Sequence, residues 1–190
     1  MSGLGVEFFE RSVHDVAREL IGCAFLYDGV GGLIVETESY ERDDPACHAH
    51  VGLTPRTATI FGPPAHAYVY LSYGIHSCVN FVCEPDGVAA AVLIRALEPR
   101  WGIETMVARR GRDGTRDLCS GPGKLTEALG IGLSDNGAAL TQPPFELRAA
   151  EGEWQVATGP RIGITKATEL PWRFCAAGSP YLSRPLRAAA

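Results

Sequence analysis

The chain has 190 residues, of which 46% are hydrophobic and 21% charged, and its formal net charge is −5. This composition excludes a disordered protein, and the length suits one domain, residues 1–190, with a sizeable hydrophobic core. No apolar run of about 18 residues occurs, and no basic segment followed by an apolar one opens the sequence, so we expect no membrane span, no secretion signal and a cytoplasmic location.

The net charge argues against broad affinity for nucleic acids, yet the charged residues are unevenly distributed. Acidic residues gather between positions 36 and 44, whereas arginines dominate the stretch from 95 to 116 and Lys124 follows it. Such asymmetry allows a basic face on an acidic molecule. The six cysteines form no Cys-x-x-Cys pair, which indicates free thiols in a reducing compartment rather than disulfides or a zinc ribbon.

The first part of the chain is typical of one helix followed by a hairpin. Apolar residues at helical spacing predict a helix over residues 12–21, with Ser12 as its N-terminal cap. Residues 23–27 form a short apolar strand, and Asp28-Gly29 is a hairpin turn signal. A second strand follows over residues 33–40.

A polar, proline-containing connection of residues 41–64 leads to a second hairpin. Connections of this length without periodicity are usually functional or mobile. Strands are predicted over residues 67–72 and 77–83, and the aromatic Tyr73 precedes Gly74 at the turn between them.

The next segments are predicted as a strand at 89–96 closed by Pro99, a helix at 101–110 and a loop at 111–117. A helix follows at 120–129, capped by Ser120 and with Pro122 in its first turn. The rest of the chain is predicted to form short strands that begin near residues 145, 153, 161 and 172. Strands outnumber helices and mostly follow one another through short turns. This order favours an α+β fold, in which a curved, mostly antiparallel and partly open barrel-like sheet is flanked by helices.

The strand at 33–40 carries two acidic residues at alternate positions. Glu36, Glu38 and Tyr40 share one face of the strand, and the two carboxylates are about 6.5 Å apart along it. Carboxylates this close influence each other's protonation, which makes one of them a candidate general base. The alternative is a solvent-facing side of an ordinary half-buried strand.

Other chemical motifs are weaker. The cluster Cys47-His48-Ala49-His50 offers metal ligands, but it is too compact for a zinc spacing, and we expect no metal. Tyr68 is expected to pack in the interior. Tyr73 differs, because a large aromatic at a hairpin tip has little core to enter and can act as a wedge that opens a base stack.

The chain resembles the alkyladenine (3-methyladenine) DNA glycosylases over nearly its whole length, from about residue 9 to 185. The stretches that carry the resemblance occur in the family's order: Val35-Glu-Thr-Glu-Ser-Tyr40, Asp44-Pro-Ala-Cys-His48, Thr54-Pro-Arg56, Tyr68-Val-Tyr-Leu-Ser-Tyr-Gly74, Cys78-Val-Asn80, Leu93-Ile-Arg-Ala-Leu-Glu-Pro99, Leu118-Cys-Ser-Gly-Pro-Gly-Lys-Leu125, Arg161-Ile-Gly163 and Arg173-Phe with Gly178-Ser-Pro180.

The resemblance implies a role for particular residues. Glu38 is the general base that activates a water, Arg95 helps to hold that water and the carboxylate, and Glu36 falls back to a supporting role. Tyr73 wedges into the duplex, while the role of His76 stays open. The base pocket is implied to comprise Tyr40, Ala46, His48, Tyr70, Asn80 and Ile162, and the DNA backbone contact Gly121, Gly123 and Lys124.

The implied activity is that of a monofunctional glycosylase of base-excision repair. It flips damaged purines (3-methyladenine, 7-methylguanine, hypoxanthine or ethenoadenine) out of duplex DNA and hydrolyses the glycosidic bond, leaving an abasic site without a cofactor. We expect a monomer whose partner is double-stranded DNA. Two alternatives remain: a non-catalytic module that binds damaged bases, and a two-carboxylate glycosidase acting on a substrate other than DNA.

Overall fold

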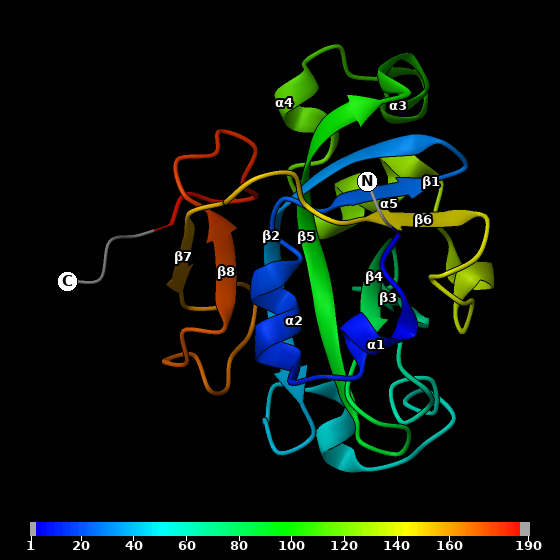
Figure 1. The fold of residues 1–190 in the computed structure, drawn as a ribbon, viewed down its shortest axis with the longest axis vertical. Helices are drawn as coiled ribbons and strands as arrows, with labels where there is room; N and C mark the ends of the chain where they lie inside the picture. Colours follow the sequence, from blue (N-terminus) through cyan, green and yellow to red (C-terminus); the bar gives the residue numbers. More distant parts are fainter. Residues whose placement is uncertain (1–2, 187–190) are drawn as a thin grey trace.

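The chain folds around one eight-stranded antiparallel sheet (Figure 1). A computed structural model describes residues 3–186, so the first two residues, part of the segment from which we expect no secretion signal, lie outside it. The strands are β1 (Ala24–Tyr27), β2 (Val30–Glu41), β3 (Ala67–Ser72), β4 (His76–Val82), β5 (Ala90–Trp101), β6 (Phe145–Arg148), β7 (Val156–Gly159) and β8 (Arg173–Ala176).

The strand order is β3-β4-β5-β2-β1-β6, and β8 also pairs with β2 and carries β7 at its outer edge. Short helices flank the sheet: α1 (Val6–Phe9), α2 (Val13–Glu19), η1 (His48–Val51), α3 (Ile103–Arg110), α4 (Thr115–Leu118), α5 (Pro122–Leu129) and η2 (Leu133–Asp135). The prediction of an α+β fold with a curved antiparallel sheet is therefore confirmed. No helix in the part of the chain described is long and apolar enough to cross a membrane.

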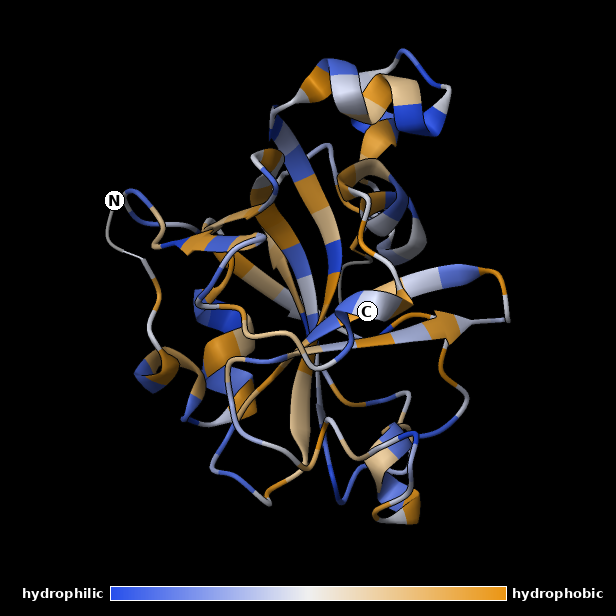
Figure 2. Cartoon of the chain, turned by 90° about the vertical axis from the view of Figure 1, so that its right-hand side faces the viewer, coloured by the Kyte–Doolittle hydropathy of each residue, from blue (hydrophilic) through white to orange (hydrophobic). Residues whose placement is uncertain are grey.

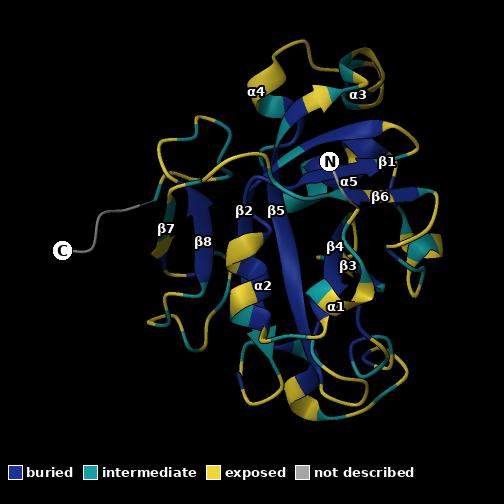
Figure 3. Cartoon of the chain, viewed as in Figure 1, coloured by how far each residue is buried: buried dark blue, intermediate teal, exposed yellow. Residues whose placement is uncertain are grey.

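The hydrophobic core lies between the long central strands and the helices that cover them. Figure 2 shows apolar residues concentrated along the strands, and Figure 3 shows β2, β5 and β8 almost wholly buried. One side of α2 packs on β2, where the Thr37 hydroxyl donates to the Ala17 carbonyl at 2.8 Å. The central strands are therefore packed on both faces, which makes them a rigid support for the side chains that they carry.

The pairing of β2 with β5 contains a local irregularity that decides the position of Arg95. Ile34 pairs with Leu97 and Thr37 with Ile94, but between them Glu36 pairs with Ala96, so Val35 and Arg95 have no partner opposite. An irregularity of this kind changes the direction of a side chain, so Arg95 departs from the regular alternation of side chains between the two faces of the strand.

Five details of the sequence-based prediction are wrong. Ser12 occupies the N-cap position of α2 without a side-chain cap bond, and the Glu84 carboxylate accepts the Val13 N–H at 3.2 Å instead. Ser120 does not cap α5, because that helix starts after Gly121. Pro99 does not close β5 but lies within it opposite Gly32, at a point where β5 has lost its β4 neighbour and the missing N–H costs little.

The two other errors concern loops. The stretch 161–164 forms no strand, although its apolar alternation predicts one, and the segment 111–117 holds the start of α4. At 161–164 a local preference is overridden by a tertiary contact, since Arg161 turns inward to an acidic partner.

Candidate active site

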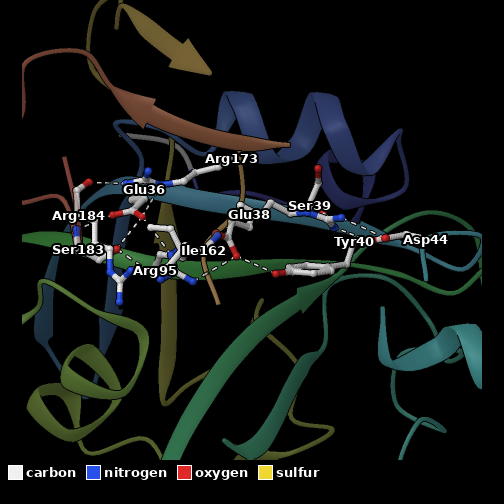
Figure 4. Close-up of polar contacts among 11 residues, drawn as sticks. Glu36, Glu38, Ser39, Tyr40, Asp44, Arg95, Ile162, Arg173, Ser183 and Arg184 are labelled. Atoms are coloured by element: carbon white, nitrogen blue, oxygen red, sulfur yellow. Dashed lines mark hydrogen bonds and ion pairs between the residues drawn. The ribbon is translucent and has the colours of Figure 1, made fainter. Parts of the chain in front are cut away.

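Glu38 lies at the centre of β2, fully buried, and its carboxylate accepts three hydrogen bonds (Figure 4). The Tyr40 hydroxyl donates to Oε2 at 2.8 Å, and Arg95 Nη1 donates to the same atom at 3.2 Å. The backbone N–H of Ile162 donates to Oε1 at 2.7 Å. Because a carboxylate offers about four acceptor sites, one on Oε1 remains for a further donor.

The protonation of Glu38 is set by opposing effects. Burial raises the pKa of its carboxyl, and the charge of Glu36 acts in the same direction. The Arg95 guanidinium, the Ile162 N–H and the Tyr40 hydroxyl all favour the ionised form and limit that rise. Such opposing effects are typical of a carboxylate prepared to accept a proton.

Glu36 is bonded differently from Glu38, although both lie on β2. Its Oε1 accepts from Arg95 Nε at 3.0 Å, Arg173 Nε at 2.8 Å and the Ser183 hydroxyl at 2.7 Å, and its Oε2 accepts the Ser183 N–H at 2.6 Å. Figure 4 shows this cluster on the far side of Arg95 from Tyr40. Arg95 therefore bridges the two acids, and Glu36 joins the C-terminal segment to the sheet.

A cavity of about 600 Å³ opens beside this network. Arg95 and Tyr73 line it, and Glu38 lies directly behind the wall made by Tyr40 and Arg95. All the residues assigned to a base pocket from the sequence also line it: Tyr40, Ala46, His48, Tyr70, Asn80 and Ile162.

One wall of the cavity consists of stacked aromatic rings. Tyr68 and Tyr70 stack with ring centroids 5.5 Å apart, and His48 meets Tyr70 edge-on at 4.6 Å. His48 therefore contacts Tyr70 directly, and no open gap separates the two rings. Arg56 Nη2 lies 3.4 Å from His48 Nε2, and Tyr68 Oη lies 3.1 Å from Nδ1. Burial and the Arg56 charge lower the pKa of His48, which favours a neutral ring.

Two polar groups of the pocket are already engaged. The Ala46 N–H donates to Asp44 Oδ1 at 2.9 Å, so this backbone donor is engaged within the protein. Asn80 is buried, and its Nδ2 donates to the Tyr68 carbonyl at 3.1 Å. This bond fixes the orientation of the amide at the cavity wall.

Tyr73 projects from the tip of the β3–β4 hairpin with 89% of its surface exposed. Its φ of 51° and the φ of 73° at Gly74 place both residues in the left-handed region that this turn requires. Ile75, next to them, is 73% exposed. An ordered turn that presents apolar side chains beside a cavity is suited to contact with a ligand outside the protein.

The segment assigned to a DNA backbone contact lies at the start of α5. Gly121 and Gly123 belong to this turn, and Lys124 bonds Asp117 and lies 3.5 Å from the Ser120 hydroxyl. A side chain at Gly123 would collide with His76, since its Cβ would lie 2.8 Å from that of His76. His76, next to the hairpin tip, thus lies directly against α5.

The Cys47–His50 cluster holds no metal-binding arrangement, and no group of three or more potential ligands occurs among residues 3–186. Cys47 Sγ instead accepts the Ala49 N–H at 3.4 Å and starts η1. All six cysteines are buried and free.

The sequence matches the family model described as methylpurine-DNA glycosylase over residues 7–180. The chain belongs to the methylpurine-DNA glycosylase family. This membership confirms the resemblance drawn from the motifs, and the protein is a DNA glycosylase of base-excision repair whose substrate is DNA.

Bacterial relatives match this chain over most of their length. The chain is 59% identical to a protein of Rhodopseudomonas palustris (strain HaA2) over 95% of this chain and 90% of the relative. It is 60% identical to one of Bradyrhizobium diazoefficiens (94% and 89%) and 56% identical to one of Nitrosospira multiformis (98% and 96%). The names of all three give 3-methyladenine DNA glycosylase as a provisional assignment.

Several polar residues of this glycosylase's site were not assigned from the sequence. Ser183 carries no motif, and Arg161 and Arg173 lie within matching stretches without an assigned role. Ile162, assigned to the base pocket, lines the cavity, and its N–H donates to Glu38, a contact that the sequence did not predict. A signal was present only for the two arginines, as cations in otherwise apolar segments that are expensive to bury without acidic partners.

Proposed function

We propose that this glycosylase hydrolyses the N-glycosidic bond of alkylated purines flipped out of duplex DNA, with Glu38 as the general base. The observation that carries this proposal is the buried Glu38 carboxylate beside an aromatic-lined cavity. The fourth acceptor site on Oε1 is the one we assign to the attacking water.

In the proposed step, the water oxygen attacks the sugar C1′ while Glu38 accepts the water proton. The bond between C1′ and the base nitrogen breaks, and its electron pair leaves with the base. A purine alkylated at a ring nitrogen is cationic, so it departs as a neutral molecule without a proton donor. A neutral lesion such as hypoxanthine requires protonation of the leaving base. The product is an abasic site, and no strand cleavage follows because no amine nucleophile is assigned.

The cavity provides the contacts that a flipped base requires. Tyr40, His48 and Tyr70 line the cavity and offer ring faces and edges, and a cationic purine stacks favourably on such rings. Because His48 now contacts Tyr70, entry of a base requires these two rings to separate. We propose that Asn80 occupies the space of a guanine 2-amino group and so disfavours normal guanine.

A panel of duplexes, each with one lesion, tests the proposal. We expect abasic sites at 3-methyladenine or 7-methylguanine and none in undamaged DNA, measured as strand breaks after alkali. Hypoxanthine and ethenoadenine define the width of the range. Lesion-specific binding without an abasic product, at high enzyme concentration and long times, would instead indicate a binding module.

We expect Tyr73→Ala to lower base excision in duplex DNA by about 10- to 100-fold, because the stacking that fills the vacated position is worth about 1–3 kcal/mol. The exposed Tyr73 side chain makes no contribution to the core, so thermal stability should stay unchanged. Excision from single-stranded DNA with the same lesion is the control, since no base stack has to be opened there. Equal losses on both substrates would contradict the wedge.

A further inference from the structure

Arg161 enters the interior next to the Glu38 site and forms an ion pair with Asp44. The side chains of both residues are completely buried. Arg161 Nη1 contacts Asp44 Oδ2, and Arg161 Nη2 donates to Oδ1 at 3.1 Å. Nη1 also donates to the Ser39 carbonyl at 3.1 Å. A two-point pair of this kind fixes orientation as well as charge.

The guanidinium joins three segments that are far apart in the sequence. It starts from the loop at 160–168, reaches the end of β2 at Ser39, and bonds Asp44 of the following connection. It also lies between two rings, with its Cζ 4.6 Å from the Tyr40 centroid and 5.1 Å from that of Trp172. The Tyr40 ring, which lines the cavity, is thus covered by the Arg161 guanidinium.

Two of the three donors to Glu38 depend on this guanidinium. Tyr40, whose hydroxyl bonds Oε2, is the ring on which Arg161 stacks. Ile162, whose N–H bonds Oε1, is the next residue in the chain. A shift of the Arg161 side chain would therefore disturb both oxygens of the carboxylate at once.

We propose that the Arg161–Asp44 pair is a positioning element for the general base. It holds the Tyr40 hydroxyl and the Ile162 N–H on Glu38, and so keeps the carboxylate ionised and oriented toward the water. This inference rests on the proposed role of Glu38. Neither residue touches the reacting atoms; both act through Tyr40 and Ile162.

Other groups also face Glu38 and must stay unchanged in a test of its protonation. They come from four elements packed around it: Glu36 and Tyr40 on β2, Tyr70 on β3, Arg95 on β5, and Arg173 and Cys175 on β8. Arg95 makes the direct ion pair at 3.2 Å. Substituting Asp44 leaves all of these side chains in place.

The test compares single-turnover excision by wild type and Asp44→Asn from pH 5 to 9 on one lesion-containing duplex. Weaker hydrogen bonds from Tyr40 and Ile162 raise the pKa of Glu38, and excision needs the ionised carboxylate. The acidic limb of the pH–rate profile should therefore move to higher pH by about one unit. The rate at pH 7.5 should fall about tenfold, with the Kd for DNA changed less than threefold. The substrate's own titration is common to both enzymes.

Thr37→Val is the matched control. It removes a buried hydrogen bond from the same strand, on the α2 side, and touches no donor to Glu38. It should lower the unfolding midpoint and leave the acidic limb in place. If Asp44→Asn does the same, with a rate reduced only in proportion to its folded fraction, the positioning role is wrong.

Trp172→Leu provides a second route if Asp44→Asn does not fold. It loosens the same guanidinium by removing one stacked ring while leaving no charge unpaired. A smaller shift of the limb in the same direction supports the inference, and no shift overturns it. If Glu38→Gln retains turnover, the proposed function itself fails; if only the pH limb stays fixed, the positioning element alone fails.

Discussion

Glu38→Gln is expected to lower base excision by about 10²- to 10⁴-fold, the range of a general base, while lesion-containing duplex DNA is still bound. The amide has the shape of the carboxylate but accepts no proton from water. Its NH₂ group must face either the Ile162 N–H or the Tyr40 and Arg95 donors, so at least one of the three hydrogen bonds is lost. Single-turnover excision and DNA binding should be measured on the same preparation.

Glu41→Gln is the control for this variant. Glu41 ends the same strand, is partly exposed, and pairs with His14 at the surface. Its removal should leave excision within about twofold of wild type, since exposed pairs contribute little. Wild-type turnover retained by Glu38→Gln would show that another group activates the water.

Glu36→Ala is expected to destabilise the protein by about 3–5 kcal/mol, because it leaves the buried Arg173 guanidinium without its carboxylate and Arg95 with Glu38 as its remaining acidic partner. Arg95 and Arg173 are 91% and 97% buried in their side chains and both bond Glu36 Oε1. The Ser183 backbone and hydroxyl lose their acceptor as well. Urea unfolding monitored by circular dichroism measures the loss.

Glu19→Ala is the matched comparison. Its pair with Arg11 is about half exposed, so its loss should cost less than about 1 kcal/mol. The two variants together separate a buried ion-pair network from a surface pair. A loss of similar size in both would contradict the structural role of Glu36.

The same network decides against the two-carboxylate glycosidase. In that mechanism both acids exchange protons with the substrate, so both must reach it. Glu36 instead accepts four hydrogen bonds, from Arg95, Arg173 and Ser183, whereas Glu38 accepts three and keeps an acceptor site on Oε1. The two acids of β2, equivalent in spacing, differ in their partners.

The local features of this protein could be predicted from the sequence. The alternation at 33–40 predicted the strand that carries Glu38, and Gly74 after Tyr73 predicted the hairpin that exposes the aromatic. Both depend on near neighbours in the chain, through the period of a strand and the φ that a turn requires. The ordered set of motifs also determined the family, because each is a short run of residues.

The partners of the carboxylates were decided only by the tertiary structure. Ile162 is 124 residues from Glu38, Arg173 is 137 from Glu36 and Ser183 is 147 from it. No periodicity spans such separations; the contacts exist because β8 and the C-terminal segment pack against β2. The register irregularity that frees Arg95 from the alternation likewise belongs to the pairing of two strands. Sequence determined which groups can titrate, and packing determined which of them are held by donors.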